Sequence, residues 1–247
     1  MQNKRIIAVP TLFTSFNLFC GFLAVLLTSA GHFTNAAWLI FIAGVFDALD
    51  GRIARAVGYS SEFGLQMDSL SDVVSAGLAP AFLMYEFYLK NLGHVGTILA
   101  FSPLLFGALR LARFNVTTSK TGKAQDYTGM PAPMAATALG SSVIFFSVTQ
   151  WAFIQRMSVI LVPAVSLLMI SSIRYSGFPR FSLREKGANR RKLLLLFGSL
   201  TIFIVFPRYF LFPFMLFYLF SGPVAAIAAI IRNEDAHLEI IPQNSEH

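Results

Sequence analysis

The sequence has few charged residues and almost no cysteine. Charged residues make up 13% of the 247 residues, whereas a soluble domain carries roughly 25%. The single cysteine, Cys20, lies inside an apolar run, so a disulfide framework and a cysteine-based metal site are both excluded. The four histidines are scattered along the chain and form no cluster of ligands or bases. The sequence also shows no internal repeat and no recognisable soluble domain. Its low charge content is not that of a soluble globular protein.

Apolar residues dominate instead. They make up 55% of the sequence, including 26 phenylalanines, and the mean hydropathy is +0.65. The net charge of +7 would also suit a nucleic-acid-binding protein, but such a protein gathers its basic residues on one soluble face. Here the basic residues lie in short gaps between apolar runs, which is the pattern of a membrane protein. We therefore expect contacts with membrane lipids and none with nucleic acid.

Several apolar segments are long enough to span a bilayer, which takes about 20 helical residues. The expected fold class is all-α, a polytopic membrane helix bundle of about eight transmembrane helices. The seventh segment is short and meets the eighth at Pro207 and Arg208, so a re-entrant hairpin is the alternative for this pair. The expected spans are 12–30, 34–57, 64–89, 94–114, 131–150, 153–173, 193–207 and 209–231.

The distribution of Lys and Arg predicts the orientation of these spans. If the N-terminus is cytoplasmic, every basic residue except Lys90, Arg156 and Arg208 falls in a cytoplasmic segment. The positive-inside rule then places both termini in the cytoplasm, and the polar chemistry faces the same side. A signal peptide is the alternative interpretation of the first segment. Its removal would invert the charge asymmetry of everything that follows.

Four aspartates lie in or beside apolar runs, at the end of the second expected span and the start of the third. Helical geometry, at about 100° per residue, places two of them on one face of each helix among small residues. Small residues allow membrane helices to approach closely, so the two faces can meet. The second span presents Asp47, Asp50, Gly51 and Ala54, continued by Gly44 and Gly58, and the third presents Gly64, Asp68, Asp72, Ser75 and Ala79.

Carboxylates in this position need cations. An ionised side chain at the bilayer centre costs about 2.5–3.5 kcal/mol even on a lenient scale. Carboxylate ligands without cysteine or histidine suit Mg²⁺ or Mn²⁺ rather than Zn²⁺, and two such ions would clamp a phosphoryl or pyrophosphate group. Gly51 and Gly64 leave room for a nucleotide diphosphate against the backbone. Arg52 and Arg55 are suited to phosphate oxygens. The alternative is a proton or ion relay in a transporter.

The spacing of these residues resembles a family signature. Asp47-x-x-Asp50-Gly51-x-x-Ala54-Arg55, then eight residues, then Gly64-x-x-x-Asp68-x-x-x-Asp72 is similar at every position to the signature of the CDP-alcohol phosphatidyltransferases. The resemblance implies that the four aspartates hold two divalent ions, Mg²⁺ or Mn²⁺, which bind the pyrophosphate of a CDP-lipid. It also implies that Asp72 is the general base on the acceptor hydroxyl. The residues implied to line the CDP pocket are Gly51, Ala54, Arg55 and Gly64.

Three further segments resemble the serine branch of this family: PTLFTSFNLFCGFLA at 10–24, LRLARFN at 109–115 and GMPAPMAAT at 129–137. The resemblance implies transfer of a phosphatidyl group from CDP-diacylglycerol to the hydroxyl of L-serine, giving phosphatidylserine and CMP. Glycerol phosphate or inositol phosphate as acceptor is the alternative within the family, although an acceptor that already carries a phosphate would need additional cationic groups.

Five polar residues in these segments are candidates for substrate contacts. Arg110, Arg113 and Asn115 are candidates for the acceptor. The flanking of a span would also account for the two arginines, and a helix end would account for Asn115. Thr14 and Asn17 are candidates for the nucleotide, with hydrogen bonding between helices as the other interpretation.

The resemblance also implies how the protein is organised. It implies a homodimer in the bacterial inner (plasma) membrane, with the active site facing the cytoplasm. The whole chain, 1–247, is expected to form a single integral-membrane domain. Within it, a six-helix catalytic core is expected at 1–175, two additional helices at 193–231 and a cytoplasmic tail at 233–247.

Overall fold

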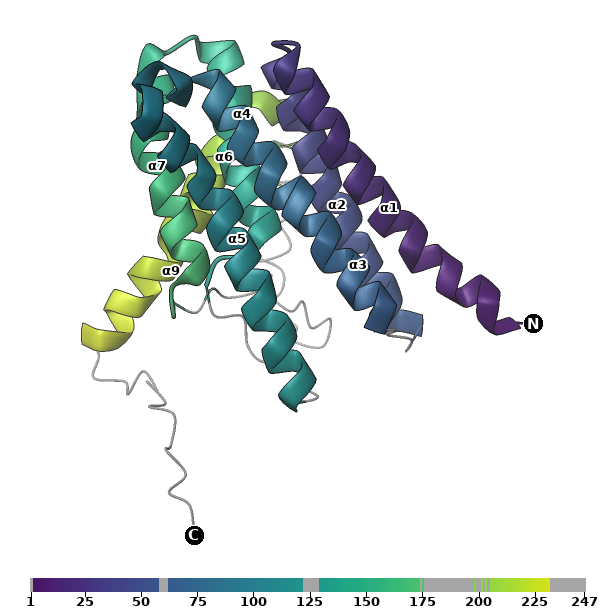
Figure 1. The fold of residues 1–247 in the computed structure, drawn as a ribbon. Helices are drawn as coiled ribbons and strands as arrows, with labels where there is room; N and C mark the ends of the chain where they lie inside the picture. The colour runs from purple at the N-terminus through teal and green to yellow at the C-terminus, as the bar shows by residue number, and fades with distance from the viewer. Residues whose placement is uncertain are drawn as a thin grey trace.

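The protein is a bundle of helices. The computed structural model describes residues 2–57, 62–121, 129–173 and 205–231, together with residues 175, 198, 201 and 203. The long helices run side by side, and no strand occurs in this part of the chain (Figure 1). The expected all-α class is therefore confirmed.

The helices follow the expected apolar runs closely. Their bounds are α1 Gln2–Ser29, α2 Phe33–Val57, α3 Glu62–Asp72, the π-helix η1 Val73–Leu78, α4 Ala79–Phe87, the 3₁₀-helix η2 Leu89–Leu92, α5 Gly93–Thr121, α6 Ala132–Thr149, α7 Ala152–Ile170 and α9 Pro207–Ile231. The break expected at Pro207 is confirmed, because α9 begins at that residue. The fixed φ of proline suits the first position of a helix.

Five of the described helices contain stretches long and apolar enough to cross a bilayer, so the chain is an integral membrane protein. These stretches are Leu12–Ser29, Leu89–Val116, Ala132–Thr149, Ala152–Ile170 and Pro207–Ile227. The expected span 193–207 lies mostly outside the described residues, and the expected tail 233–247 lies outside them entirely. The count of eight spans and the cytoplasmic position of the termini therefore stay predictions.

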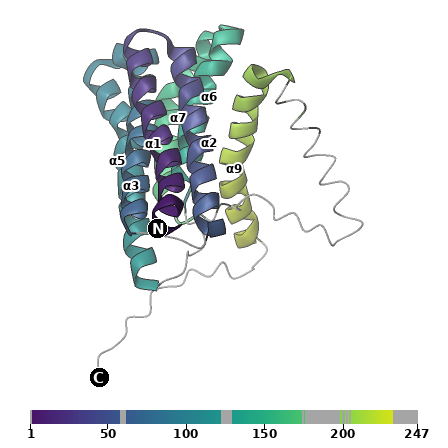
Figure 2. The ribbon, with the colours of Figure 1, turned by 90° about the vertical axis from the view of Figure 1, so that its right-hand side faces the viewer.

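α6 lies at the centre of the bundle. In its membrane span 61% of the residues are buried, against 28–39% in the other four. α2 packs along α6, where Gly140 lies against Ala37. α9 also packs on α6 and stands at the edge of the bundle (Figure 2). Alanine, glycine and serine dominate the buried face of α6, and such small residues allow membrane helices to pack closely.

The rod formed by residues 62–87 changes its helix type directly after Asp72. α3 ends at this residue, η1 follows as a π-helix, and α4 then resumes the α-helix. The expected stripe from Gly64 to Ala79 assumed α-helical geometry throughout, and the π-helix changes the angular spacing of the residues after Asp72. A π-helix closes each hydrogen bond over one more residue than an α-helix does. Ser75 and Ala79 are nevertheless buried.

The segment before α6 is fixed by the end of α7. The Gly129 N–H donates to the Ile173 carbonyl and the Met130 N–H donates to the Leu168 carbonyl, each at 2.9 Å. Gly129 has φ +81°, and a Cβ atom there would collide with the carbonyl of Met169. Only glycine fits this position without strain. The start of the GMPAPMAAT segment thus has a structural role.

Tyr175 contacts α9 through a hydrogen bond and through its ring. Its hydroxyl donates to the Leu219 carbonyl at 3.1 Å. Pro223 has no N–H to offer this carbonyl, so the tyrosine replaces a missing helical hydrogen bond. The ring of Tyr175 lies over Gly222, where a Cβ atom would come within 2.6 Å of its Cζ. The contact therefore joins Tyr175, five residues after α7, to α9.

Candidate metal and substrate site

Three of the four aspartates of the signature lie together between α2 and α3. Asp47 and Asp50 come from α2 and Asp68 comes from α3, and their carboxylate oxygens lie within 4.8 Å of one another. Asp50 is almost fully buried, and the other two are half-buried. The helical faces that the sequence analysis expected to meet do meet at these residues.

Asp72 lies one helical turn beyond Asp68 on α3 and is also buried. It lines a narrow crevice together with Asp47 of α2 and Ser75 of η1. Pro133 and Ala136 of α6 close the other side of this crevice. The fourth aspartate thus lies beside the group of three, on the side of the central helix.

α1 donates hydrogen bonds to two of the carboxylates. The Thr14 Oγ1 donates to Asp50 Oδ2 at 2.9 Å, and the Asn17 Nδ2 donates to Asp72 Oδ1 at 3.1 Å. The Ser71 hydroxyl donates to the Thr14 carbonyl at 3.1 Å, which ties α3 to the same helix. Hydrogen bonding between helices is therefore confirmed for Thr14 and Asn17. Contact of these two residues with a nucleotide stays a prediction.

α5 brings Asn115 to the other side of α3. The Asn115 Nδ2 donates to the Ser69 hydroxyl at 2.9 Å. The helix-end interpretation of Asn115 was wrong, because α5 continues to Thr121. The buried oxygens Asn115 Oδ1 and Asp68 Oδ1 have no hydrogen-bond partner among the described residues. Buried oxygens of this kind usually have a partner, so both are available to accept from a ligand.

The remaining candidate residues belong to α2, α3 and α5. Arg110 is half-buried and Arg113 is exposed, both on α5. Gly51 and Gly64 are half-buried near the facing ends of α2 and α3. Arg52 is exposed. The side chains of Ala54 and Arg55 and the whole of Gly58 lie outside the described residues.

The donor set fits a divalent cation. The close group offers only carboxylate oxygens, and one of them, Asp68 Oδ1, is buried without a partner among the described residues. Hard oxygen ligands in this number suit Mg²⁺ or Mn²⁺. The residues that could hold such an ion are Asp47, Asp50 and Asp68, with Asp72 beside them.

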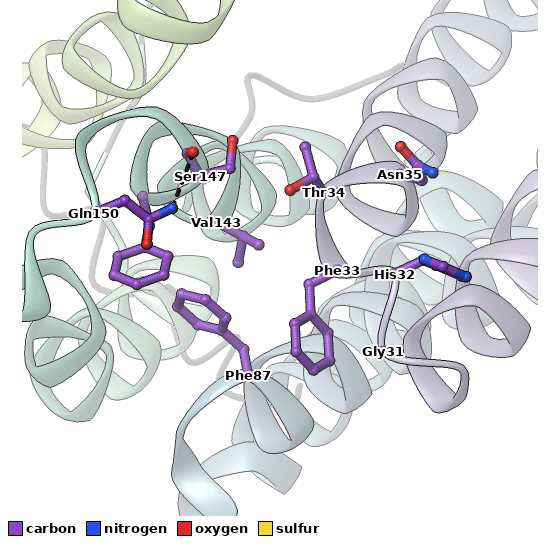
Figure 3. Close-up of a pocket in the computed structure, with 10 residues that line it drawn as sticks. Gly31, His32, Phe33, Thr34, Asn35, Phe87, Val143, Ser147 and Gln150 are labelled. Atoms are coloured by element: carbon purple, nitrogen blue, oxygen red, sulfur yellow. Dashed lines mark hydrogen bonds between the residues drawn. The ribbon is translucent and has the colours of Figure 1, made fainter.

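A second cavity, of about 350 Å³, lies at the other end of α2. Phe33 and Phe87 line it with their rings packed edge to face, 6.0 Å between the ring centroids, and Figure 3 shows Val143 and Gln150 of the neighbouring segment nearby. The distance along α2 from Asn35 at this cavity to Asp47 is about 18 Å at 1.5 Å per residue. None of its lining residues is acidic. This cavity is therefore separate from the carboxylate group.

Sequence reasoning missed two serines of the site. Ser69 and Ser71 lie between Asp68 and Asp72 on α3 and form hydrogen bonds with α5 and α1 respectively. Their polar character in a half-apolar helix was the available signal. The signature does not fix these positions, so the pattern alone could not distinguish them from solvated residues.

The chain is similar to known proteins over most of its length. The family model described as CDP-alcohol phosphatidyltransferase matches residues 7–171. A CDP-diacylglycerol–serine O-phosphatidyltransferase of Helicobacter pylori (strain J99) is 31% identical over 90% of this chain and 92% of its own. An archaetidylserine synthase of Methanothermobacter thermautotrophicus is 40% identical over 71% of this chain and 73% of its own. A CDP-diacylglycerol–serine O-phosphatidyltransferase of Methanocaldococcus jannaschii is 38% identical over 71% and 77%.

Proposed function

The chain belongs to the CDP-alcohol phosphatidyltransferase family, and on this premise we propose that it transfers a phosphatidyl group from CDP-diacylglycerol to the hydroxyl of L-serine. The products are phosphatidylserine and CMP. The close group of Asp47, Asp50 and Asp68 is the observation that carries the reaction type. The acceptor is supported by the relatives, since the bacterial and archaeal names share serine although one of them specifies a different lipid.

The four signature aspartates hold two divalent ions, Mg²⁺ or Mn²⁺, in this proposal. Asp47, Asp50 and Asp68 supply the close carboxylates, and Asp72 completes the set. When bound, the ions neutralise the pyrophosphate and stabilise CMP as it leaves. The residue-level support is the buried Asp68 Oδ1, which has no partner among the described residues.

The transfer proceeds as a direct displacement at phosphorus. Asp72 accepts the proton of the serine hydroxyl, and the serine oxygen attacks the phosphorus that carries the diacylglyceryl group. A P–O bond forms to serine as the P–O bond to CMP breaks, and CMP leaves with the electron pair. The described histidines, His32 and His94, lie at the opposite ends of α2 and α5 from the site, so neither pairs with a nucleophile there. A trapped phosphatidyl–enzyme adduct would contradict this mechanism.

The two substrates approach the aspartates from different directions and meet beside Asp72. The nucleotide lies toward the Gly51, Ala54 and Arg55 stretch and Gly64, within reach of Thr14 and Asn17. Serine lies toward α5, where Arg110 and Arg113 can hold its carboxylate. Asn115 Oδ1 is a buried acceptor without a partner among the described residues, which suits the serine ammonium.

The protein acts in the bacterial inner membrane as a homodimer, with this site facing the cytoplasm. The support for the orientation is the gathering of basic residues on the side of the carboxylates. Residues 1–175 form the catalytic core, 193–231 form two additional helices and 233–247 form the tail. The support for this division is that the family match ends at residue 171.

The acceptor is tested by CMP release from CDP-diacylglycerol and Mn²⁺ with purified protein. Serine, glycerol phosphate, inositol phosphate and water are supplied in separate reactions. We expect release with serine alone. Release with another alcohol would refute the serine assignment and keep the reaction type. Mn²⁺ uptake into liposomes without any CDP-lipid would instead favour the transporter alternative.

A further inference from the structure

Asn17 is an unusual residue for the middle of a membrane helix. Its side chain is fully buried, with 0% exposure, and its Nδ2 donates to Asp72 Oδ1 at 3.1 Å. Its own Oδ1 has no hydrogen-bond partner among the described residues. Burial of an amide oxygen without a hydrogen-bond partner costs free energy in an apolar medium. Asn17 is buried in spite of this cost, and its side-chain hydrogen bond is the bond to Asp72.

The backbone around Asn17 is arranged so that this hydrogen bond can form. One turn farther along α1, a Cβ atom at Gly21 would lie 2.7 Å from the Cα of Ser75. Glycine therefore allows α1 to touch the π-helix that begins immediately after Asp72. On the other side of Asn17, the Ser71 hydroxyl donates to the Thr14 carbonyl. Contacts above and below Asn17 thus hold α1 against the residues on both sides of Asp72.

We propose that Asn17 is a positioning residue that fixes the orientation of the Asp72 carboxylate for proton transfer. The terminal torsion of an aspartate side chain is broad, and one hydrogen bond from a fixed amide to Oδ1 selects a single orientation. Oδ2 is then the oxygen that takes the proton of the acceptor hydroxyl. The inference rests on the proposed function, in which Asp72 is the general base.

A packing role for Asn17 predicts different behaviour. If Asn17 only joined α1 to α3, its loss would lower the stability of the protein and disturb the binding of substrate and of metal together. A positioning role predicts a lower kcat at nearly unchanged KM for serine, because the orientation of Asp72 matters in the transition state and not for the binding of the acceptor. Misplacement of a catalytic group can lower a rate by about 100-fold.

The test compares Asn17→Leu, which keeps the size and removes the donor, with Asn17→Ser, which keeps a donor of shorter reach. Thr28→Val is the matched control, because Thr28 is a buried residue of α1 whose hydroxyl donates to Ala24 at the far end of the helix. For Asn17→Leu we expect kcat to fall by about 10- to 100-fold. For Asn17→Ser we expect a smaller fall, and for Thr28→Val no change.

Two further measurements separate the interpretations. The KM for serine and the calorimetric affinity for Mn²⁺ without substrate are expected to stay near those of the wild type in both Asn17 variants. An unchanged kcat in Asn17→Ser or in folded Asn17→Leu would overturn this inference alone, and so would an effect confined to KM or to Mn²⁺ affinity. A wild-type protein that releases no CMP with serine would overturn the proposed function and this inference with it.

Discussion

At the scale of the residue, the four signature aspartates have different surroundings. Carboxylate oxygens of Asp47, Asp50 and Asp68 lie within 4.8 Å of one another. Asp72 accepts a hydrogen bond from Asn17 and lines the narrow crevice against α6. A close group of carboxylates suits cation binding, whereas a single oriented carboxylate suits proton transfer. The same change to asparagine should therefore have different consequences at the two places.

Asp47→Asn is expected to weaken Mn²⁺ binding and to lower activity by more than about 100-fold. Even residues that only support a metal ligand cost about 10- to 100-fold when they are lost. Mn²⁺ titration calorimetry and CMP release measure the two effects. Glu86→Gln is the control, because it removes one carboxylate charge from an exposed pair with Lys90. Wild-type Mn²⁺ affinity in Asp47→Asn would exclude Asp47 as a ligand.

Asp72→Asn is expected to keep CDP-diacylglycerol binding and to lose turnover. Removal of a general base costs about 100- to 10,000-fold in rate, while Asp47, Asp50 and Asp68 still supply three carboxylates for the ions that bind the CDP-lipid. Equilibrium binding of the CDP-lipid and single-turnover CMP release separate the two. Normal turnover in this variant would remove Asp72 as the base.

The site residues could be predicted from sequence to the extent that a fixed spacing identifies them. The hydrogen bonds that hold them could not. Asn17 and Asp72 lie 55 positions apart, and Ser69 and Asn115 lie 46 positions apart. Such pairs depend on how three helices pack against one another, which the periodicity of a single helix does not encode. For Thr14 and Asn17, the sequence therefore left two interpretations open: contact with the nucleotide and hydrogen bonding between helices.

At the scale of the element, hydropathy predicts the helices well. A membrane segment must satisfy its backbone internally, so a long apolar run becomes a helix. The π-helix at Val73–Leu78 could not be predicted, because its residues are as apolar as those of an α-helix. The end of α5 was missed for the opposite reason, since the helix continues past the apolar run into a polar segment that ends at Thr121.

Gly222→Leu is expected to displace α9 from the bundle, because the added side chain meets the ring of Tyr175. Overpacking costs about 1–3 kcal/mol, and each kcal/mol lowers Tm by about 2–4 °C in a chain of this size. Thermal unfolding in detergent should therefore show a Tm lower by about 2–12 °C. Ala225→Leu adds the same side chain at an exposed position of α9 and should leave Tm unchanged. Equal shifts in both variants would contradict the proposed fastening of α9.

At the scale of the whole molecule, α9 lies apart from the part of the chain that the family model covers. The family match covers residues 7–171 and includes every helix that contributes to the carboxylate site. α9 lies outside that match and packs on α6, away from α1 and α3 (Figure 2). The distribution of basic residues concerns the whole chain, and it predicts which end of the bundle faces the cytoplasm.

Cysteine labelling in intact cells tests this orientation. In a Cys20→Ala background, Glu62→Cys at the start of α3 and His32→Cys in the turn before α2 mark opposite ends of the bundle; both native residues are exposed. We expect a membrane-impermeant maleimide to label the cysteine at position 32 in intact cells. The cysteine at position 62 should react only after lysis. The reverse pattern would invert the topology.

The most direct test of the central claim follows radiolabelled serine into lipid. Purified protein with CDP-diacylglycerol and Mn²⁺ should produce labelled phosphatidylserine and CMP in equal amounts. Chelation of the metal or the Asp72→Asn substitution should abolish both products. Release of CMP without label in the lipid fraction would contradict the account, because the phosphatidyl group would then have gone to water or to another alcohol.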